Sequence, residues 1–129
     1  MTPLHIIVVD DNSANRILPG LILRRLGHTV HECDSSTQAL ALVHATPEMF
    51  THVLLDISMP TLSGIDVCRQ LRAEPRLQGL RIIAYTAHAM AHEQAAMLNA
   101  GFDALLIKPV RQDELLHALG LPHAGAPKA

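Results

Sequence analysis

The chain has 129 residues, 49% of them hydrophobic, which is enough to bury one core and leaves no room for a second ordinary domain. Its formal net charge of -2, without a basic cluster, argues against direct binding to nucleic acid, and no apolar run approaches the roughly 20 residues of a membrane span. We therefore expect one cytoplasmic domain over residues 1–120, without an output domain, and a disordered tail rich in Pro, Gly and Ala over 121–129.

Five apolar runs alternate with five helical patterns along the chain. Parallel strands buried on both faces are typically short apolar runs, and the helices that cover them carry one apolar stripe. The alternation predicts an α/β fold in which a parallel sheet has helices on both faces and right-handed crossovers. We expect strands at about 6–9, 29–33, 53–56, 80–87 and 105–107, and helices at about 13–26, 36–45, 64–71, 89–100 and 111–119.

The first two helices carry recognisable end signals. Ser13 and Ser36 are predicted as their N-caps, because a serine hydroxyl can accept a hydrogen bond from a free backbone N–H of the first turn. Gly27 is predicted to end the first helix. Inside that helix stand Pro19 and Gly20, and since an internal proline costs about 3 kcal/mol in a regular helix, we predict a kink there.

Polar side chains stand where four of the apolar runs end. Asp10 and Asp11 follow the first run, Asp56 ends the third, Thr86 ends the fourth and Lys108 follows the fifth. The carboxyl ends of parallel strands share one edge, where open α/β sheets place their sites. Carboxylates that hold a hard divalent cation, with a lysine as a point charge, can handle a phosphoryl group. Asp56 taken alone fits the cap of a turn equally well, and the other strand ends decide between these interpretations.

In this order and approximate spacing, these residues resemble those of a response-regulator receiver domain of two-component signalling. The resemblance runs from about His5 to Leu119, and the opening from Asp10 to Arg16 is most similar to receivers of hybrid kinases. It implies the flavodoxin-like, doubly wound (βα)5 fold, whose five-stranded parallel sheet has the order 2-1-3-4-5. It also implies a cis peptide bond before Pro109.

The resemblance implies that Asp56 is the nucleophile that takes a phosphoryl group from a phosphohistidine, with Mg²⁺ as the cofactor. Asp11 and Asp56 would offer carboxylate oxygens to this ion, and Asp10 would act through a bound water. The backbone carbonyl of Ser58 would complete the protein ligands. A few carboxylates, with waters and a phosphate, suit the octahedral demand of Mg²⁺ better than Ca²⁺.

Two further residues are implied in the chemistry. Lys108 would pair with an oxygen of the incoming phosphoryl group, and Thr86 would donate a hydrogen bond to that group once it is bound. The protein would then be a stoichiometric phosphoacceptor that catalyses its own phosphorylation, with self-dephosphorylation left open. Aspartate-based phosphatases instead carry an Asp-x-Asp pattern on their first strand, whereas here that strand ends in two adjacent acids.

A receiver of this kind implies a histidine kinase or a histidine phosphotransfer protein as its partner in a phosphorelay. It would signal through a downstream protein that docks on the face of the fourth helix, fifth strand and fifth helix, or it would shuttle the phosphoryl group. The alternative is a pseudo-receiver, an interaction module that is never phosphorylated and whose acids are usually eroded. All acids of the pattern are present here, which favours the phosphoacceptor.

Three positions set this chain apart within the family pattern. Many receivers have an aromatic residue three positions before the lysine, where this chain has Leu105. We therefore hypothesise that Thr86 moves on phosphorylation without the rotation of a ring. Ser58 and His88 stand at positions that flank the path of the hydrolytic water, and the sequence leaves the sign of their effect open.

Overall fold

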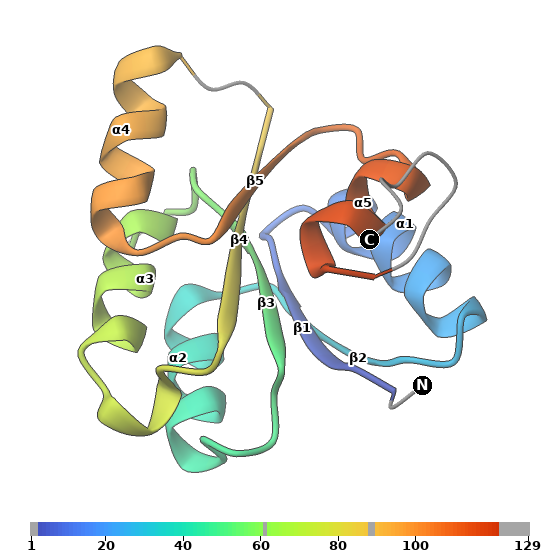
Figure 1. Ribbon diagram of the computed structural model, residues 1–129, viewed down its shortest axis with the longest axis horizontal. Helices are drawn as coiled ribbons and strands as arrows, with labels where there is room; N and C mark the ends of the chain where they lie inside the picture. The colour runs from blue at the N-terminus through green and yellow to red at the C-terminus, as the bar shows by residue number, and fades with distance from the viewer. Residues whose placement is uncertain (1–2, 61, 88–89, 122–129) are drawn as a thin grey trace.

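The protein folds around a five-stranded parallel sheet (Figure 1). The computed structural model describes residues 3–60, 62–87 and 90–121. The strands lie in the order β2-β1-β3-β4-β5, which confirms the predicted doubly wound topology. Their bounds are β1 His5–Val9, β2 Thr29–Cys33, β3 His52–Asp56, β4 Arg81–Thr86 and β5 Ala104–Ile107.

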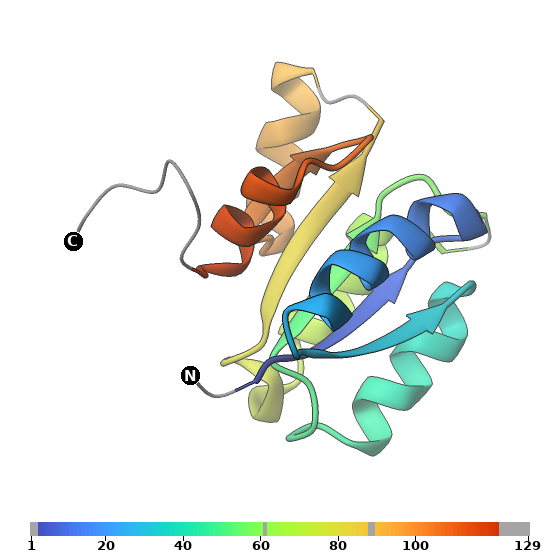
Figure 2. The ribbon, with the colours of Figure 1, turned by 90° about the vertical axis from the view of Figure 1, so that its right-hand side faces the viewer.

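Helices cover both faces of the sheet, as the alternation of strand and helix patterns predicted (Figure 1, Figure 2). Two helices, α1 and α5, lie on one face, and α2, α3 and α4 lie on the other. The helices are α1 Ser13–Arg25, α2 Ser36–Ala45, α3 Gly64–Arg72, α4 Ala91–Ala100 and α5 Gln112–Leu119, with a short 3-10 helix η1 at Pro75–Leu77.

Each strand divides its side chains between two hydrophobic cores. Because successive strand side chains point to opposite faces, Ile7 and Val9 of β1 pack in the core beneath α2, α3 and α4, whereas Ile6 and Val8 pack in the core beneath α1 and α5. All four side chains are fully buried. Burial of each such side chain contributes about 1.5–3 kcal/mol, so both cores hold the register that aligns the strand ends.

The N-caps predicted for the first two helices are each one residue too late. The side chain of Asn12, rather than that of Ser13, accepts a hydrogen bond from the N–H of Ala14. Ser35 likewise caps α2 in place of Ser36. Where two residues able to form an N-cap are adjacent, the backbone conformation decides which of them is the cap. The cap residue is extended, whereas the next residue is already helical.

Pro19 lies inside α1 and does not end it. The helix is continuous from Ser13 to Arg25, and both Pro19 and Gly20 are buried. A proline inside a helix has no N–H for the carbonyl one turn earlier, and this loss is compatible with a bend. The kink predicted at this position stays a prediction, since an uninterrupted helix can be straight or bent.

Parts of the predicted outline fall outside the described residues. The fourth helix was predicted to start at Ala89, which is not described, and α4 begins at Ala91 with Met90 as its N-cap. Of the predicted disordered tail only Leu121 is described, so the boundary at residue 120 stays a prediction. Among the described residues, no helix has the length and hydropathy needed to cross a membrane.

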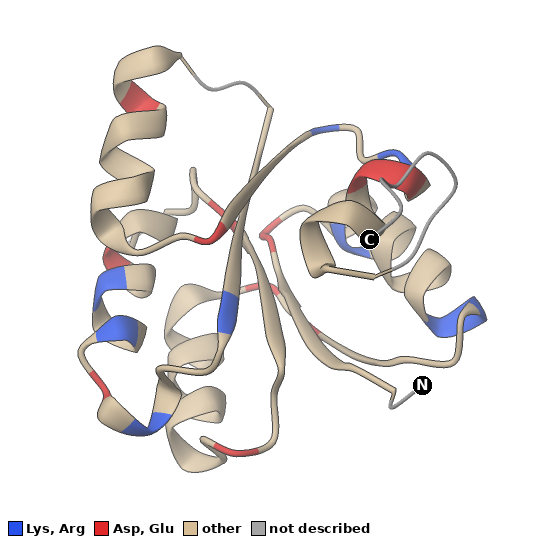
Figure 3. Ribbon diagram, viewed as in Figure 1, with Lys and Arg blue, Asp and Glu red and all other residues tan. Residues whose placement is uncertain are grey.

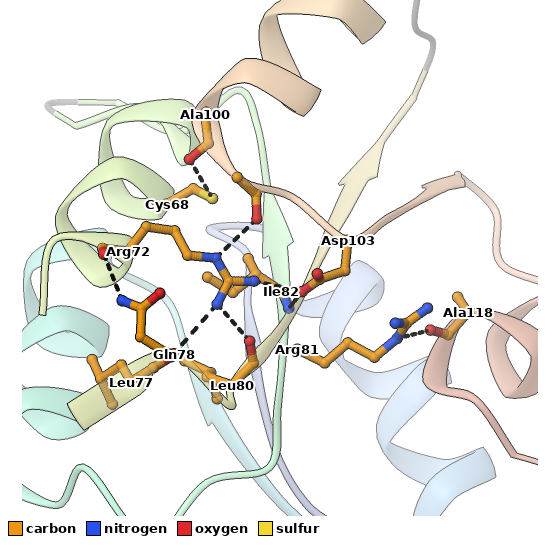
Figure 4. A network of polar contacts seen from close by, with 11 residues as sticks. Cys68, Arg72, Leu77, Gln78, Leu80, Arg81, Ile82, Ala100, Asp103 and Ala118 are labelled. Atoms are coloured by element: carbon orange, nitrogen blue, oxygen red, sulfur yellow. Dashed lines mark hydrogen bonds and ion pairs between the residues drawn. The ribbon is translucent and has the colours of Figure 1, made fainter. Parts of the chain in front are cut away.

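Arg72, the last residue of α3, ties together the segments that lead into β4 and β5 (Figure 4). Its Nη1 donates to the carbonyl of Leu80 at 2.7 Å, and its Nε donates to the carbonyl of Gly101 at 2.9 Å. The guanidinium also pairs with Asp103, whose carboxylate accepts the N–H of Ile82 at 2.8 Å. Hydrogen bonds from a charged donor are roughly twice as strong as neutral ones, so this network fixes the amino ends of both strands.

Gly64 allows α3 to begin very close to the end of β3. Its N–H donates to the carbonyl of Ile57 at 3.0 Å, and a Cβ at this position would lie 2.3 Å from the carbonyl oxygen of Asp56. Since Cβ atoms do not approach a backbone oxygen so closely, only glycine fits here. The conformation of the segment that follows Asp56 therefore depends on this residue.

Gly64→Ala is expected to lower the free energy of unfolding by about 2–4 kcal/mol, because α3 or the backbone of Asp56 must move to admit the methyl group. Urea unfolding followed by circular dichroism measures the change. Gly79→Ala is the matched control, since a Cβ at Gly79 meets no atom within 4 Å. Equal stability of the two variants would contradict the close approach of α3 to β3.

Candidate functional site

Three carboxylates gather at the carboxyl edge of the sheet. Asp10 follows β1, Asp11 comes next and Asp56 ends β3. One oxygen of each lies within 4.8 Å of the others. Figure 3 shows the acidic segments at the ends of β1 and β3 and a basic segment beyond β5. The sequence predicted that these strand ends share one edge, and the structure brings them together there.

Lys108 supplies the positive charge between two of these carboxylates. Its Nζ lies 2.7 Å from Oδ2 of Asp10 and 3.3 Å from Oδ1 of Asp56. Burial acts to lower the pKa of Lys108, but the two carboxylates outweigh it, and this pKa is raised above its ordinary value. The side chain, 15% exposed, therefore stays charged while it remains within reach of solvent.

Two neighbours fix the backbone around Asp10. Its Oδ1 accepts a hydrogen bond from the N–H of Asn12 at 2.9 Å, and Nη1 of Arg16 donates to its carbonyl at 2.8 Å. Nε of Arg16 also lies 3.5 Å from a carboxylate oxygen of Glu32 in β2. Sequence reasoning missed the contact of Arg16 with Asp10, because an arginine in the first turns of a helix carries no signal of it.

Asp56 is an unusually buried carboxylate, with 4% of its surface exposed. Burial raises the pKa of its carboxyl group. The N–H of Ser58, which donates to Oδ1 at 3.1 Å, acts in the opposite direction, as does Lys108, whereas repulsion from Asp10 adds to the rise. The pKa of Asp56 is raised overall, because burial, helped by the repulsion from Asp10, outweighs the N–H of Ser58 and the ammonium of Lys108.

The other predicted residues lie beside this cluster. Thr86 ends β4 and is 6% exposed, and its carbonyl accepts the N–H of Lys108 at 2.7 Å, which joins the ends of β4 and β5. Ser58 is exposed in the segment after β3. The peptide bond before Pro109 is cis, as the resemblance implied. His88 lies outside the described residues.

The donor atoms of the cluster suit a hard divalent cation. All three are carboxylate oxygens, and exposed Asp11 opens the cluster to solvent. Among the described residues, the ammonium of Lys108 is the one partner of the buried Oδ2 of Asp10. A carboxylate oxygen in this state has lone pairs left for a cation or its water. The residues thus fit Mg²⁺, which binds through one or two carboxylates and keeps several waters.

Leu105 stands where the resemblance implied that many receivers have an aromatic residue, and a tyrosine ring lies elsewhere near the site. Leu105 is half-buried in β5 and lines a small hollow together with Met97 and Phe102. Tyr85 of β4 is 1% exposed, and the centroid of its ring lies 5.1 Å from Nζ of Lys108. Sequence reasoning missed Tyr85, because in the sequence it is one more apolar member of a strand.

Comparisons with known proteins agree with this geometry. A model of the response regulator receiver domain family matches residues 6–120. The signal transduction histidine-protein kinase BarA of Escherichia coli (strain K12) is 40% identical over 116 residues, which cover 90% of this chain and 12% of BarA. The sensor histidine kinase GacS of Pseudomonas protegens is 36% identical over 114 residues, which cover 86% of this chain and 12% of GacS.

Solved structures share the fold. Chemotaxis protein CheY4 of Vibrio cholerae matches with a TM-score of 0.85 at 21% identity, over 92% of this chain and 98% of that one. A CheY-like receiver domain protein of Methanospirillum hungatei JF-1 matches with a TM-score of 0.80 at 28% identity, over 92% of both chains. The chain spans 12% of the length of BarA and of GacS. From the family match and the arrangement of its strand ends, the chain belongs to the response regulator receiver domain family of two-component signalling.

Proposed function

We propose that this receiver works in the cytoplasm as the phosphoacceptor of a phosphorelay and that Asp56 takes the phosphoryl group. The observation that carries the proposal is the ammonium of Lys108, 3.3 Å from Oδ1 of Asp56 at the open edge of the sheet. A charged lysine there can neutralise a phosphoryl oxygen as it arrives. The relatives BarA and GacS are named as histidine kinases, which supports a phosphohistidine as the donor.

The transfer breaks one bond to phosphorus and forms another. A carboxylate oxygen of Asp56 attacks the phosphorus, and the N–P bond of the donor histidine breaks. The electron pair of that bond returns to the imidazole, which leaves as a neutral ring when its other nitrogen carries a proton. Because burial and Asp10 raise the pKa of Asp56, its ionised carboxylate is more basic than an exposed one and hence a better nucleophile.

Lys108 and Thr86 would hold the transferred group. Lys108 would pair with one phosphoryl oxygen, and the hydroxyl of Thr86 would donate a hydrogen bond to another. The backbone contact between these two residues, 2.7 Å long, supports their acting on the same group. Movement of Thr86 would reach α4 through the segment after β4, with no ring to rotate at Leu105.

Mg²⁺ would be held by Asp11 and Asp56, by Asp10 through a water, and by the backbone carbonyl of Ser58. When bound, the ion supplies positive charge that neutralises the phosphoryl oxygens. Asp10 also holds the ammonium of Lys108 at 2.7 Å. With one acceptor carboxylate in each chain, the protein acts as a stoichiometric acceptor that promotes its own phosphorylation.

An apolar surface on α1 supports docking of the donor protein beside the site. Ile17, Leu18, Leu21 and Leu26 are between 41% and 52% exposed, and three of them line a hollow that reaches the start of α5. Clustered apolar side chains in contact with solvent mark a binding surface. Since α1 begins two residues after Asp11, a histidine kinase or phosphotransfer protein bound here would present its histidine to the acidic cluster.

A second surface supports docking of a downstream protein. On the face formed by α4, β5 and α5, Leu98 is 71% exposed and Ile107 is 41% exposed. This face adjoins the end of β4, where Thr86 would respond to the phosphoryl group.

The pseudo-receiver alternative gains no support. The acids of such a module are usually eroded, whereas oxygens of Asp10, Asp11 and Asp56 lie within 4.8 Å of one another. The family match covers residues 6–120 and thus includes all three positions.

Incubation of the protein with acetyl phosphate and Mg²⁺ is expected to add one phosphoryl group, detected by intact mass spectrometry. The adduct should be absent in Asp56→Ala, which lacks the nucleophile, and in a sample from which a chelator has removed Mg²⁺. An adduct that persists in Asp56→Ala would place the acceptor elsewhere. No adduct from acetyl phosphate, a histidine kinase or a phosphotransfer protein would overturn the proposed function.

Asp56→Asn is expected to raise the free energy of unfolding by about 1 kcal/mol at neutral pH without divalent cations, because it removes the cost of burying a charged carboxylate and its repulsion from Asp10. The pKa of folded Asp56 lies above its ordinary value of 3.8, so ionisation of this group costs stability as the pH rises through that value. The gain should therefore shrink as the pH is lowered toward about 4. Urea unfolding at several pH values measures it, with exposed Asp34→Asn as the control.

Mg²⁺ is expected to stabilise the wild-type protein by mass action and to stabilise Asp56→Asn less, since the variant lacks one charged ligand. The same unfolding experiment with added Mg²⁺ measures the difference. An equal effect of Mg²⁺ on both proteins would argue against Asp56 as a ligand.

Leu21→Glu is expected to slow phosphotransfer from a histidine phosphotransfer protein about tenfold or more, because it places a charge in the apolar docking surface. Phosphorylation by acetyl phosphate should be unchanged, since this donor needs no docking. Leu98→Glu, on exposed α4, is the matched control. A loss with both donors would assign the defect to the site instead of to docking.

A further inference from the structure

Tyr85 lies at the end of β4, which the side chain of Lys108 must cross to reach the two carboxylates. In the sheet order, β4 separates β5, which Lys108 follows, from β3, which ends at Asp56, and from β1, which Asp10 follows. Neighbouring strands are about 4.8 Å apart, so the Lys108 side chain has to extend over the end of β4 to reach either carboxylate. The residue of β4 that pairs with Asp56 in the register is Tyr85.

The ring of Tyr85 is on the same face of the sheet as the acidic cluster. Paired residues of parallel strands project on the same face, and Tyr85 packs in the core beneath α1 and α5 together with Leu54, two residues before Asp56. The ring centroid lies 5.1 Å from Nζ of Lys108. An ammonium at this distance from a tyrosine ring is within the range of a cation–π attraction, which is stronger where water is excluded.

The ion pairs with the two carboxylates do not by themselves fix the position of the Lys108 ammonium. The lysine side chain has four rotatable bonds and a compact charge without preferred direction, so two carboxylate oxygens can hold it in several conformations. A ring that is 1% exposed cannot shift to follow it. The ring therefore adds a fixed third point of attraction, which narrows the positions open to the ammonium.

The phenol group faces the segment that follows Lys108. The backbone of Val110, two residues beyond the lysine, is close enough to act on the pKa of the phenol. Burial raises the pKa of Tyr85, while Lys108 and the backbone of Val110 act to lower it, as expected for groups that face one another. An aliphatic residue would lack the ring that faces the ammonium.

We propose that Tyr85 is a positioning residue, whose ring holds the ammonium of Lys108 over the end of β4 so that it meets the phosphoryl group arriving at Asp56. The part of this proposal that concerns phosphorylation rests on the proposed function. The contact between ring and ammonium exists in the unphosphorylated protein and can be tested separately.

The first test is the rate of Asp56 phosphorylation by acetyl phosphate with Mg²⁺. Tyr85→Leu is expected to lower the rate about three- to tenfold, since the ring contact is lost, whereas Tyr85→Phe keeps the ring and should stay within about twofold of wild type. Ile83→Val is the matched control, because Ile83 is fully buried in the same core two residues before Tyr85. A rate for Tyr85→Leu equal to that of wild type would overturn the proposal.

A double-mutant cycle separates positioning from general packing. In a Lys108→Ala background, Tyr85→Leu should cause no further loss of rate, because the group that the ring positions is gone. The same three- to tenfold loss in that background would show that Tyr85 acts only on packing and would overturn the proposal. Tyr85→Met, with its adaptable side chain, replaces Tyr85→Leu in both experiments if the latter does not fold.

The second test is nuclear magnetic resonance of the lysine side chain without a phosphodonor. The Hε protons of Lys108 should be shifted upfield by the ring in wild type and in Tyr85→Phe, and this shift should vanish in Tyr85→Leu or Tyr85→Met. Absence of the shift in wild type would overturn the contact itself. If wild type shows the shift but is never phosphorylated, the proposed function fails while the positioning of Lys108 by Tyr85 stands.

Discussion

The site depends on one ammonium group held between two buried carboxylates. Asp10 is fully buried and Asp56 nearly so, and charges in such surroundings are costly unless they are paired. Lys108 pairs with both, but it reaches them only because the sheet aligns the ends of β1, β3 and β5. The two hydrophobic cores that set this alignment are therefore as necessary to the chemistry as the charged residues are.

The two ends of the sheet serve different purposes. At the amino ends of β4 and β5, the carboxylate of Asp103 and the guanidinium of Arg72 meet with their hydrogen bonds largely satisfied by backbone groups. At the carboxyl ends, Oδ2 of Asp10 is paired with the ammonium of Lys108 and with no backbone group of the described residues, and Asp56 has a raised pKa. The first arrangement stabilises the fold, whereas the second leaves groups able to bind and react.

The sequence was sufficient to predict a parallel sheet and the cluster of acids, because short apolar runs with a polar end are a local signal and parallel strands align those ends. The order of the strands came instead from the resemblance to receiver domains. The N-caps of the helices were harder to predict. Ser35 and Ser36, for example, have the same side chain and differ only in backbone conformation. The contacts of Arg16 and Tyr85 were not predictable. They depend on which face of an element a side chain occupies and on partners that are distant in the sequence.

Helix α1 begins beside the acidic cluster and also carries exposed leucines. Its length therefore sets the distance between the proposed docking surface and the cluster. Leu21 lies eight residues beyond Ser13, where α1 begins, and at 1.5 Å per residue this corresponds to about 12 Å along the helix axis. In the proposed function, a donor protein bound at Leu21 would have to offer its phosphohistidine at that distance and in that direction. The spacing would therefore discriminate between partners by their shape as well as by their affinity.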